Sequence, residues 1–440
     1  MTKILKFHGG VHPSYHKNFT ESLPAEEMPL QAKYVIPLSQ NIGAASVPVV
    51  ERGDTILKGQ MIAEPGGFVS VPLHAPTSGK VKKIDMYPHP SGATMSAIEI
   101  KPDGEDKWID GCGVLRDYEN LDAEAIKKAV WDAGLVGMGG AAFPTHVKLS
   151  PPKEKPIDTL ILNGAECEPY LTSDHRTMLE RGVEVLKGAK LLAKALGVEN
   201  IIIGIEENTL DAAENLIALA DDSFNIETLK VIYPQGSEKQ LIYALTGRSV
   251  PTGGLPMDVG IVVQNVGTAV ATYDACAHGY PLIERIMTIT GKGIKQPKNL
   301  RVRIGTILSD IVDYCGGLDE NTAKAIMGGP MMGIGQYTLD VPVVRGTSGM
   351  VFLTSDESTL FTSEPCIRCA SCVDACPMGL LPTVISSYTV NEMFDSAESY
   401  NALDCIECGC CSFSCPSHIP LVQNIRRAKA EILAKRKKAV

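Results

Sequence analysis

The chain has 440 residues, too many for one hydrophobic core, and its length predicts three or four domains. Hydrophobic residues make up 44% and charged residues 21%, as in ordinary globular proteins, and the formal net charge of -10 argues against a nucleic-acid-binding protein. The sequence lacks a run of about 18 apolar residues, so we expect no transmembrane helix, and the few apolar residues before His8 do not predict a signal peptide.

Residues 1–30 are predicted to form an irregular N-terminal extension. Its histidines, His8, His12 and His16, are four residues apart, as metal ligands on one helix face would be. The glycines and the proline between them prevent a helix, so packing and turn roles are favoured over a metal site.

Residues 31–110 contain short apolar runs separated by Gly-rich turns, which predict a small β sandwich. The phrases GDTILKGQ and HAPTSGKV resemble those of biotinyl/lipoyl-type domains, which carry a prosthetic group on a lysine at a hairpin tip. Because no lysine lies between Gln60 and Gly79, we expect a docking or structural element and no swinging arm.

From residue 115 to residue 268, helical and strand-like patterns alternate, which predicts an α/β domain with a parallel sheet. We expect a helix near 121–134 capped by Asn120 or Asp122, strands at 158–163, 201–205 and 229–233, and helices at 173–196, 208–220 and 237–245. Ligands of such sheets bind at loops beyond the carboxyl ends of the strands.

Three loops of this domain have the composition of a ligand site. Residues 134–148 offer a Gly-rich backbone that can approach a phosphate closely, followed by a lysine. Residues 163–176 place two carboxylates directly after a strand, where they can accept hydrogen bonds from ribose hydroxyls. Residues 234–240 open a helix, which is a ready anion site. An ordinary Gly-rich turn, a solvated acidic loop and a simple N-cap by Ser237 are the competing interpretations.

Residues 269–352 form another β-rich stretch. Its methionines, Met327, Met331 and Met332, are interpreted as packing residues in preference to ligands.

Residues 355–425 contain two copies of Cys-x2-Cys-x2-Cys-x3-Cys-Pro, from Cys366 to Pro377 and from Cys405 to Pro416. This is the spacing of a bacterial two-cluster ferredoxin, in which the fourth cysteine of each copy ligates the other cluster. One [4Fe-4S] cluster is thus predicted on Cys366, Cys369, Cys372 and Cys415, and the second on Cys376, Cys405, Cys408 and Cys411. Paired zinc sites are the alternative, but zinc ribbons usually show two separated CxxC pairs. The five remaining cysteines are scattered, which fits a reducing cytosolic compartment.

Residues 426–440 form a basic, helical tail. It is either a solvated terminal helix or an electrostatic docking element for an acidic partner or a lipid surface.

Taken together, the segments GMGGAAFPTHVK, NGAECEP, QGSE and VVQNVGT resemble the flavin- and NADH-binding segments of the complex I NADH-oxidising flavoprotein subunit. With the GGVHP opening and the tandem cysteine motifs, the whole chain resembles the RnfC component of the Rnf electron-transport complex, a ferredoxin:NAD oxidoreductase. The resemblance implies a Rossmann-like FMN/NADH-binding domain at 115–268, a β-grasp, soluble-ligand-binding domain at 269–352, and an α-helical ferredoxin module.

The resemblance also implies the cofactor-binding residues, and no catalytic side chain is expected because the cofactors perform the chemistry. The implied set is Gly137, Gly139, Gly140, Phe143, Lys148, Asn163, Glu166, Glu168, Gly236, Glu238, Asn265 and Thr268. Three positions depart from the complex I pattern and remove polar groups: Met138 stands for an arginine, Ala165 for an aspartate and Ser237 for a glutamate.

The function implied is a peripheral subunit on the cytoplasmic face of the membrane that passes electrons between NAD(H), FMN and two [4Fe-4S] clusters. Its partners would be the membrane-embedded and iron–sulfur subunits, which couple ferredoxin oxidation to ion translocation. The alternatives are a soluble flavo-iron–sulfur reductase that donates electrons to proline reductase or cobalamin, and a non-catalytic iron–sulfur adaptor.

Overall fold

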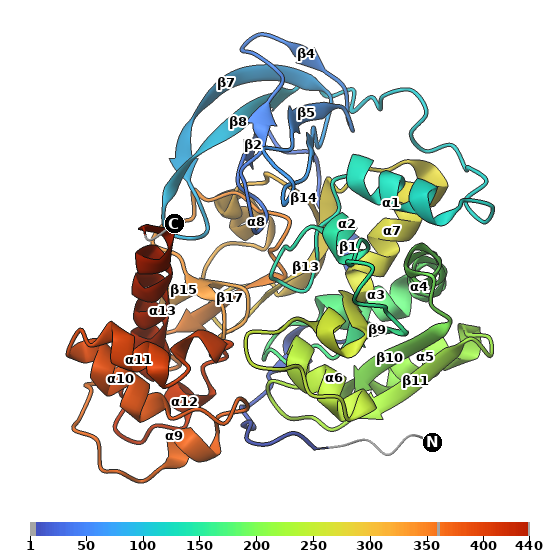
Figure 1. Ribbon diagram of the computed structural model, residues 1–440. Helices are drawn as coiled ribbons and strands as arrows, with labels where there is room; N and C mark the ends of the chain where they lie inside the picture. The colour runs from blue at the N-terminus through green and yellow to red at the C-terminus, as the bar shows by residue number, and fades with distance from the viewer. Residues whose placement is uncertain (1–5, 359–360, 439–440) are drawn as a thin grey trace.

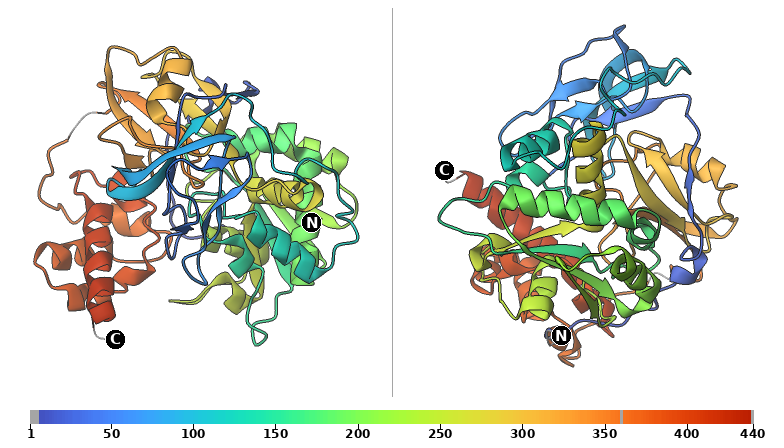
Figure 2. Two further views of the ribbon diagram at one scale, coloured as in Figure 1. Left: turned by 90° about the horizontal axis from the view of Figure 1, so that it is seen from above. Right: turned by 90° about the vertical axis from the view of Figure 1, so that its right-hand side faces the viewer.

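The computed structural model describes residues 6–358 and 361–438. Figure 1 shows four parts: a β-rich part at the top, a helical part at the lower left, an α/β part at the lower right, and a part built on the sheet with β13 (Glu284–Thr290), β15 (Thr322–Met327) and β17 (Gly349–Thr354) in the centre. Figure 2 shows the same parts from two further sides. In the described chain, no helix is long and apolar enough to cross a membrane.

The first part is built from two antiparallel sheets. One has the order β2 (Tyr34–Pro37), β8 (Thr94–Pro102), β7 (Gly79–Pro88) and β4 (Thr55–Ile56), and the other has the order β3 (Val47–Pro48), β5 (Met61–Glu64) and β6 (Leu73–His74). Ile56, Ile62 and Ile98 belong to one apolar core that the two sheets share. A shared core between two sheets is the arrangement of a sandwich.

The second part contains a parallel sheet in the order β11 (Phe224–Leu229), β10 (Asn200–Glu206), β9 (Thr159–Gly164) and β12 (Ile261–Asn265). One face packs on α1 (Ala123–Asp132), α4 (Gly182–Leu196), α5 (Leu210–Leu219) and α7 (Val266–His278), and the other face packs on α6 (Glu238–Thr246). Asp122 caps α1 by accepting a hydrogen bond from the amide of Ala125, in agreement with one of the two predicted caps.

Two predicted elements of this part are wrong in their bounds. The helix predicted at 173–196 is divided into α3 (Ser173–Glu180) and α4, because the backbone leaves helical geometry at Arg181. The Arg181 guanidinium forms an ion pair with the Asp274 carboxylate at 2.9 Å. The strand predicted at 229–233 ends at Leu229, because β11 pairs with β10 and β10 itself ends at Glu206.

The third part is a six-stranded mixed sheet. Its order is β1 (Ala25–Glu27), β14 (Lys298–Arg303), β13 (Glu284–Thr290), β17 (Gly349–Thr354), β15 (Thr322–Met327) and β16 (Ile334–Gly335), with α8 (Leu308–Tyr314) packed against it. Strand β1 pairs in parallel with β14, 274 positions later in the chain, so part of the predicted N-terminal extension completes this sheet.

The fourth part is helical, with α9 (Ser371–Asp374), α10 (Pro382–Val390), α11 (Phe394–Ser399), α12 (Cys410–Phe413) and α13 (Leu421–Lys438). Helix α13 includes the described residues of the basic tail, and it buries Ile425, Ala428 and Ile432 against α10 and α11. Its basic side chains form ion pairs inside this part, with the pairs Arg426–Glu407, Lys429–Glu407, Arg427–Glu392, Lys435–Asp395 and Arg436–Glu398. These pairs supply an intramolecular explanation for most of the tail's charge.

The N-terminal segment connects three of the four parts. Figure 1 shows it in blue, passing between the α/β part and the C-terminal helices. The amide of Gly10 donates to the carbonyl of Ala375 at 3.0 Å, Val11 pairs with Tyr233, and the carbonyl of Tyr15 accepts from the amide of Tyr170 at 2.7 Å. The parts are therefore held in contact by a segment that has little structure of its own.

Close contact between α4 and α7 gives a test of this packing. A Cβ atom added at Gly188 of α4 would lie 1.8 Å from the carbonyl oxygen of Ala269 on α7. We expect Gly188→Ala to lower the free energy of unfolding by about 1–3 kcal/mol through overpacking, measured as a lower thermal midpoint by circular dichroism. Gly335→Ala is the matched control, because a Cβ there meets no atom within 4 Å. Equal midpoints for the two variants would contradict the packing.

Candidate functional site

The centre of the candidate site is the carboxyl edge of the parallel sheet, where Asn163, next to the last residue of β9, lies opposite Asn265, which ends β12. The Asn163 amide donates to the carbonyl of Gly236 at 2.8 Å and its oxygen accepts from the amide of Ala165 at 3.0 Å. The Asn265 oxygen caps α7 by accepting from the amide of Gly267 at 2.8 Å. Both asparagines thus hold loops in place around the edge of the sheet.

The Gly-rich loop lies over this edge. Its base is closed by the pairing of Val136 with Pro144, and the amide of Met138 donates to the hydroxyl of Thr268 at 3.0 Å. A Cβ atom on Gly139 would be 3.5 Å from the Cβ of Asn265, so the loop backbone approaches the asparagine closely. Gly140 has a φ of 104°, which favours glycine. The neighbouring predicted residues, Gly137 and Phe143, are joined by a hydrogen bond from the amide of Gly137 to the carbonyl of Phe143 at 2.8 Å.

A buried cation supports the Gly-rich loop from behind. Arg285 donates to the carbonyl of Met138 at 3.1 Å and to the carbonyl of Arg345. Burial lowers the pKa of Arg285 to about 10, still well above neutral pH, so the guanidinium remains charged and holds the loop through its carbonyls.

The third predicted loop meets the first through an ion pair. Lys148 lies 2.8 Å from the carboxylate of Glu238 and also donates to the carbonyl of Val263 at 3.1 Å. Glu238 is the first residue of α6, so the helix N-terminus, the lysine and the middle of β12 meet at one place. The competing interpretation of this loop, a simple N-cap by Ser237, is not supported, because the Ser237 side chain makes no cap hydrogen bond.

The two predicted acidic residues of the second loop point to different neighbours. The Glu166 carboxylate accepts from the hydroxyl of Ser173 at 2.9 Å and from the amides of Asp174 and His175, and so caps α3. The Glu168 carboxylate accepts from the amides of Met331 and Met332 at 3.2 and 2.8 Å. Burial raises the pKa of Glu168 to about 7, against the opposing effect of these amides.

The structure therefore brings ten of the twelve predicted residues to one edge of the sheet. The carboxylates of the other two, Glu166 and Glu168, accept hydrogen bonds from backbone amides at the margin of this edge. Gathered at the edge are Gly137, Gly139, Gly140, Phe143, Lys148, Asn163, Gly236, Glu238, Asn265 and Thr268. The buried side-chain amide nitrogens of Gln235 and Gln264 have no hydrogen-bond partner among the described residues. Orphaned donors beside a glycine loop and two helix N-termini fit a flavin or a nucleotide phosphate.

Two residues of the site were not predicted from the sequence. Lys17 is buried beneath the second loop, and its amine donates to the carbonyls of Glu166, Glu168 and Leu171 at 2.7, 3.4 and 2.5 Å. Glu206, at the end of β10, is buried with both carboxylate oxygens unpartnered among the described residues. A polar residue at the end of a predicted strand was the available signal for Glu206, whereas nothing local marks Lys17.

The predicted cluster cysteines line two separate cavities. One, of about 590 Å³, is lined by Cys366, Cys369, Cys372 and Cys415, and the other, of about 20 Å³, by Cys376, Cys405, Cys408 and Cys411 with their neighbours. Each cavity thus gathers three thiols of one motif and the fourth thiol of the other. Among the described residues, no group of three or more His, Cys, Asp or Glu side chains is arranged to hold a single metal ion.

The smaller cysteine cavity adjoins the edge of the sheet. The Tyr233 hydroxyl donates to the carbonyl of Cys408 at 2.8 Å, and Gln240 of α6 donates to the carbonyl of Pro377 at 3.2 Å. Cys410, which belongs to neither predicted ligand set, is fully buried with its thiol 3.9 Å from the carbonyl of Tyr233. The loop between β11 and α6 therefore contacts both the candidate nucleotide site and the cysteine module.

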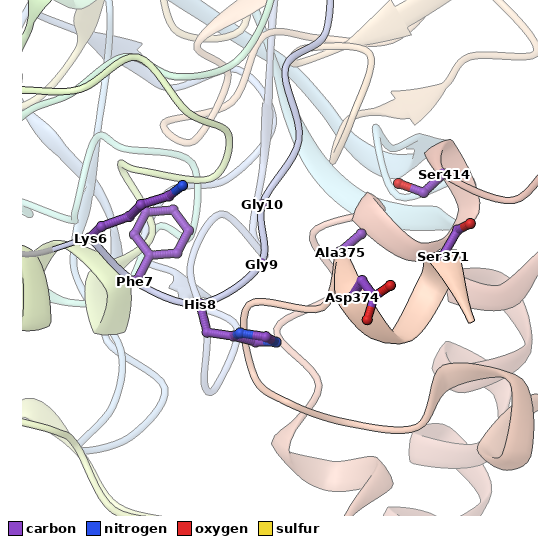
Figure 3. Close-up of a pocket in the computed structure, with 9 residues that line it drawn as sticks. All are labelled: Lys6, Phe7, His8, Gly9, Gly10, Ser371, Asp374, Ala375 and Ser414. Atoms are coloured by element: carbon purple, nitrogen blue, oxygen red, sulfur yellow. The ribbon is translucent and has the colours of Figure 1, made fainter. Parts of the chain in front are cut away.

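A third cavity, of about 530 Å³, lies between the N-terminal segment and the cysteine module. Figure 3 shows its two walls, with Lys6, Phe7 and His8 on one side and Ser371 and Asp374 of α9 on the other. The Ser371 hydroxyl donates to the thiol of Cys369 at 3.3 Å. Of the three histidines noted in the sequence, His8 lines this cavity, and the described residues contain no group of three or more His, Cys, Asp or Glu side chains arranged to hold a metal ion.

Family models match four consecutive stretches of the chain. An RnfC barrel sandwich hybrid domain matches residues 5–105, a Nuo51 FMN-binding domain matches 130–274, an SLBB domain matches 286–335, and a 4Fe-4S dicluster domain matches 359–419. The fold and site thus define an electron-transfer protein that joins an FMN-binding domain of the complex I type to an iron–sulfur domain.

The relatives identify the family. The C component of a proton-translocating ferredoxin:NAD(+) oxidoreductase complex from Clostridium ljungdahlii is 48% identical over 97% of this chain and 94% of its own length. A Na(+)-translocating counterpart from Acetobacterium woodii is 47% identical over 98% of both chains. The chain belongs to the RnfC family, the C components of Rnf-type ferredoxin:NAD(+) oxidoreductase complexes.

A solved structure shares the fold. A chain of the NAD+-reducing [NiFe]-hydrogenase in the air-oxidized state matches with a TM-score of 0.50 and 19% identity, covering 73% of this chain and 62% of the hydrogenase chain. At this identity the match shows a similar fold and nothing more.

Removing the cation under the second loop tests its role. We expect Lys17→Met to leave three carbonyls without a donor and to destabilise the protein by about 3 kcal/mol, since each buried unsatisfied group costs about 1–3 kcal/mol. Thermal unfolding of the two variants and the parent protein measures this. Lys82→Met, at an exposed position of β7, is the control and should unfold like the parent protein. If both variants unfold alike, Lys17 does not hold the loop.

Proposed function

We propose that the chain is the NAD(H)-reactive, peripheral electron-transfer subunit of an Rnf-type membrane complex. It passes electrons between NAD(H), bound FMN and two [4Fe-4S] clusters, and partner subunits oxidise ferredoxin and translocate ions. The observation that carries this proposal is the contact between the candidate nucleotide edge and the smaller cysteine cavity through Tyr233 and Gln240. The names of the relatives and the matched FMN-binding and 4Fe-4S models support it.

The residues at the edge of the sheet would hold the flavin and the dinucleotide. FMN, when bound, exchanges electron pairs with NADH and single electrons with clusters. The Gly-rich loop and the N-termini of α6 and α7 would receive phosphate and carbonyl oxygens. Lys148 and Glu238 would position the phosphate and the ribose, and Asn163 and Asn265 keep the surrounding loops in register.

The two cysteine sets differ in exposure, which gives the clusters an order. Cys376, Cys408 and Cys411 are buried beside the nucleotide edge, whereas Cys366 and Cys369 are exposed. The cluster on the set with the buried cysteines Cys376, Cys408 and Cys411 would exchange electrons with the flavin. The cluster on the set with the exposed cysteines Cys366 and Cys369 would face a partner subunit. Exposed Ile367, between these two cysteines, offers an apolar contact for that partner.

The acidic residue at the start of α6 gives a test of the nucleotide site. We expect Glu238→Gln to lower kcat/KM for NADH oxidation about tenfold or more, mainly through KM, because it removes a charge that orients Lys148 and a ribose acceptor. Steady-state assays with an artificial electron acceptor measure this, and cluster absorbance should be unchanged. Glu214→Gln, at an exposed position of α5, is the control. Unchanged NADH kinetics in Glu238→Gln would refute the assigned site.

The crossed ligand sets can be tested by counting iron. Replacing Cys366, Cys369 and Cys372 with serine should lower the content from about eight irons to about four, as for loss of one cubane. In that background, Cys376→Ser should remove most of the remaining iron and Cys415→Ser should not, because Cys376 lines the surviving cavity. Colorimetric iron and sulfide assays on anaerobically purified protein measure this. The reverse dependence on Cys415 would contradict the crossing.

A further inference from the structure

Glu206 is a buried carboxyl group for which the described residues show no hydrogen-bonding role. It is 1% exposed, and neither carboxylate oxygen has a hydrogen-bond partner among the described residues. Gly204 lies opposite Asn163 in the β9–β10 register, and side chains alternate along a strand, so Glu206 projects from the same face of the sheet as Asn163. Buried polar groups are normally paired, so an orphaned carboxyl at the edge of the candidate site requires an explanation.

The groups that face Glu206 come from two neighbouring segments. They are Tyr15 and Lys17 of the N-terminal segment, and Glu166 and Cys167 of the loop after β9. Burial raises the pKa of Glu206 to about 8, the charge of Lys17 opposes this shift, and Glu166 adds to it. The Tyr15 hydroxyl is a second orphan in the same place, and burial together with Glu206 raises its pKa to about 12. The carboxyl is thus mostly protonated near neutral pH, and it can exchange its proton there.

The proposed reaction needs such a group. When the C–H bond of the nicotinamide breaks, NADH gives up two electrons and one proton, whereas each of two clusters accepts one electron and no proton. The balance is NADH plus two oxidised clusters giving NAD+, two reduced clusters and one proton. One proton for every NADH must therefore leave the buried edge of the sheet, and in the reverse direction one must be delivered to it.

We propose that Glu206 is the proton-exchanging residue of this site, a step that rests on the proposed function. In the direction of NAD+ reduction its neutral carboxyl gives up the proton, and in the direction of NADH oxidation its carboxylate takes the proton up. Lys17 stabilises the carboxylate form between turnovers. A general acid or base works best when its pKa lies near the working pH, and the surroundings of Glu206 meet that requirement.

Infrared difference spectroscopy of the full chain, loaded with FMN and iron–sulfur clusters, tests the proposal. Spectra recorded before and after anaerobic reduction by NADH, in H₂O and in D₂O, should show a protonated-carboxyl C=O band that changes in the parent protein. We expect the band change to be lost in Glu206→Gln and kept in Glu207→Gln, since Glu207 is exposed and pairs with Lys230. If the same carboxyl band change persists in a Glu206→Gln variant that binds FMN and is bleached by NADH, the proposal is overturned.

Two further readouts keep the outcome decisive. If the parent protein neither binds FMN nor responds to NADH, the proposed function fails and the role of Glu206 falls with it, whereas a normal response without a carboxyl band rejects Glu206 alone.

If Glu206→Gln does not fold, Glu206→Asp retains the ionisable group with a shorter reach. The rate of NAD+ reduction should fall as pH rises through the carboxyl pKa, and Glu206→Asp should shift the pH at which this fall occurs. If the fall occurs at the same pH in Glu206→Asp and in the parent protein, the proposal is overturned.

Discussion

The hydrogen bond from the Tyr233 hydroxyl to the carbonyl of Cys408 joins the two halves of the chain on which electron transfer depends. The same tyrosine pairs through its backbone with Val11, and three residues later Gly236 accepts from Asn163. One short loop thus fixes the nucleotide edge, the N-terminal segment and the cysteine module relative to one another. A displacement of this loop would change the separation between flavin and cluster.

The electrostatics of the site follow from an excess of buried acid over buried base. Glu166, Glu168, Asp174 and Glu206 gather around Lys17, with Arg285 behind the Gly-rich loop. Burial raises the pKa of Asp174, and the nearby charge of Glu166 raises it further. Burial raises the pKa values of Glu168, Asp174 and Glu206 towards neutral pH, so these three carboxyl groups can hold protons there.

Local patterns predicted the parts of the fold that depend on local rules. The alternation of strands and helices gave a parallel sheet, and strand ends placed Asn163 and Asn265 at one edge. The cysteine spacing anticipated which thiols line each cavity, while the assignment of ligands stays a prediction. The run at 229–233 has strand-forming residues, yet its neighbour β10 has already ended, so tertiary pairing overrides local preference.

The rest could not be read from local patterns, because it depends on contacts between distant residues. Lys17 meets its carbonyl partners some 150 positions later, and β1 pairs with a strand some 270 positions later. The carboxylates of Glu166 and Glu168 were expected to face the ligand, but the structure gives them backbone amides of α3 and of the loop after β15. Which way a side chain turns at a crowded edge is decided by these distant partners.

The most direct test of the account is anaerobic. The purified full chain is assayed for iron, sulfide and flavin, and NADH is then added while flavin and cluster absorbance are followed on the millisecond scale. The account predicts about eight irons and bound FMN, with flavin absorbance bleaching before cluster absorbance. Full iron with no flavin and no response to NADH would contradict it, and would identify the chain as an iron–sulfur adaptor that receives its electrons from another protein.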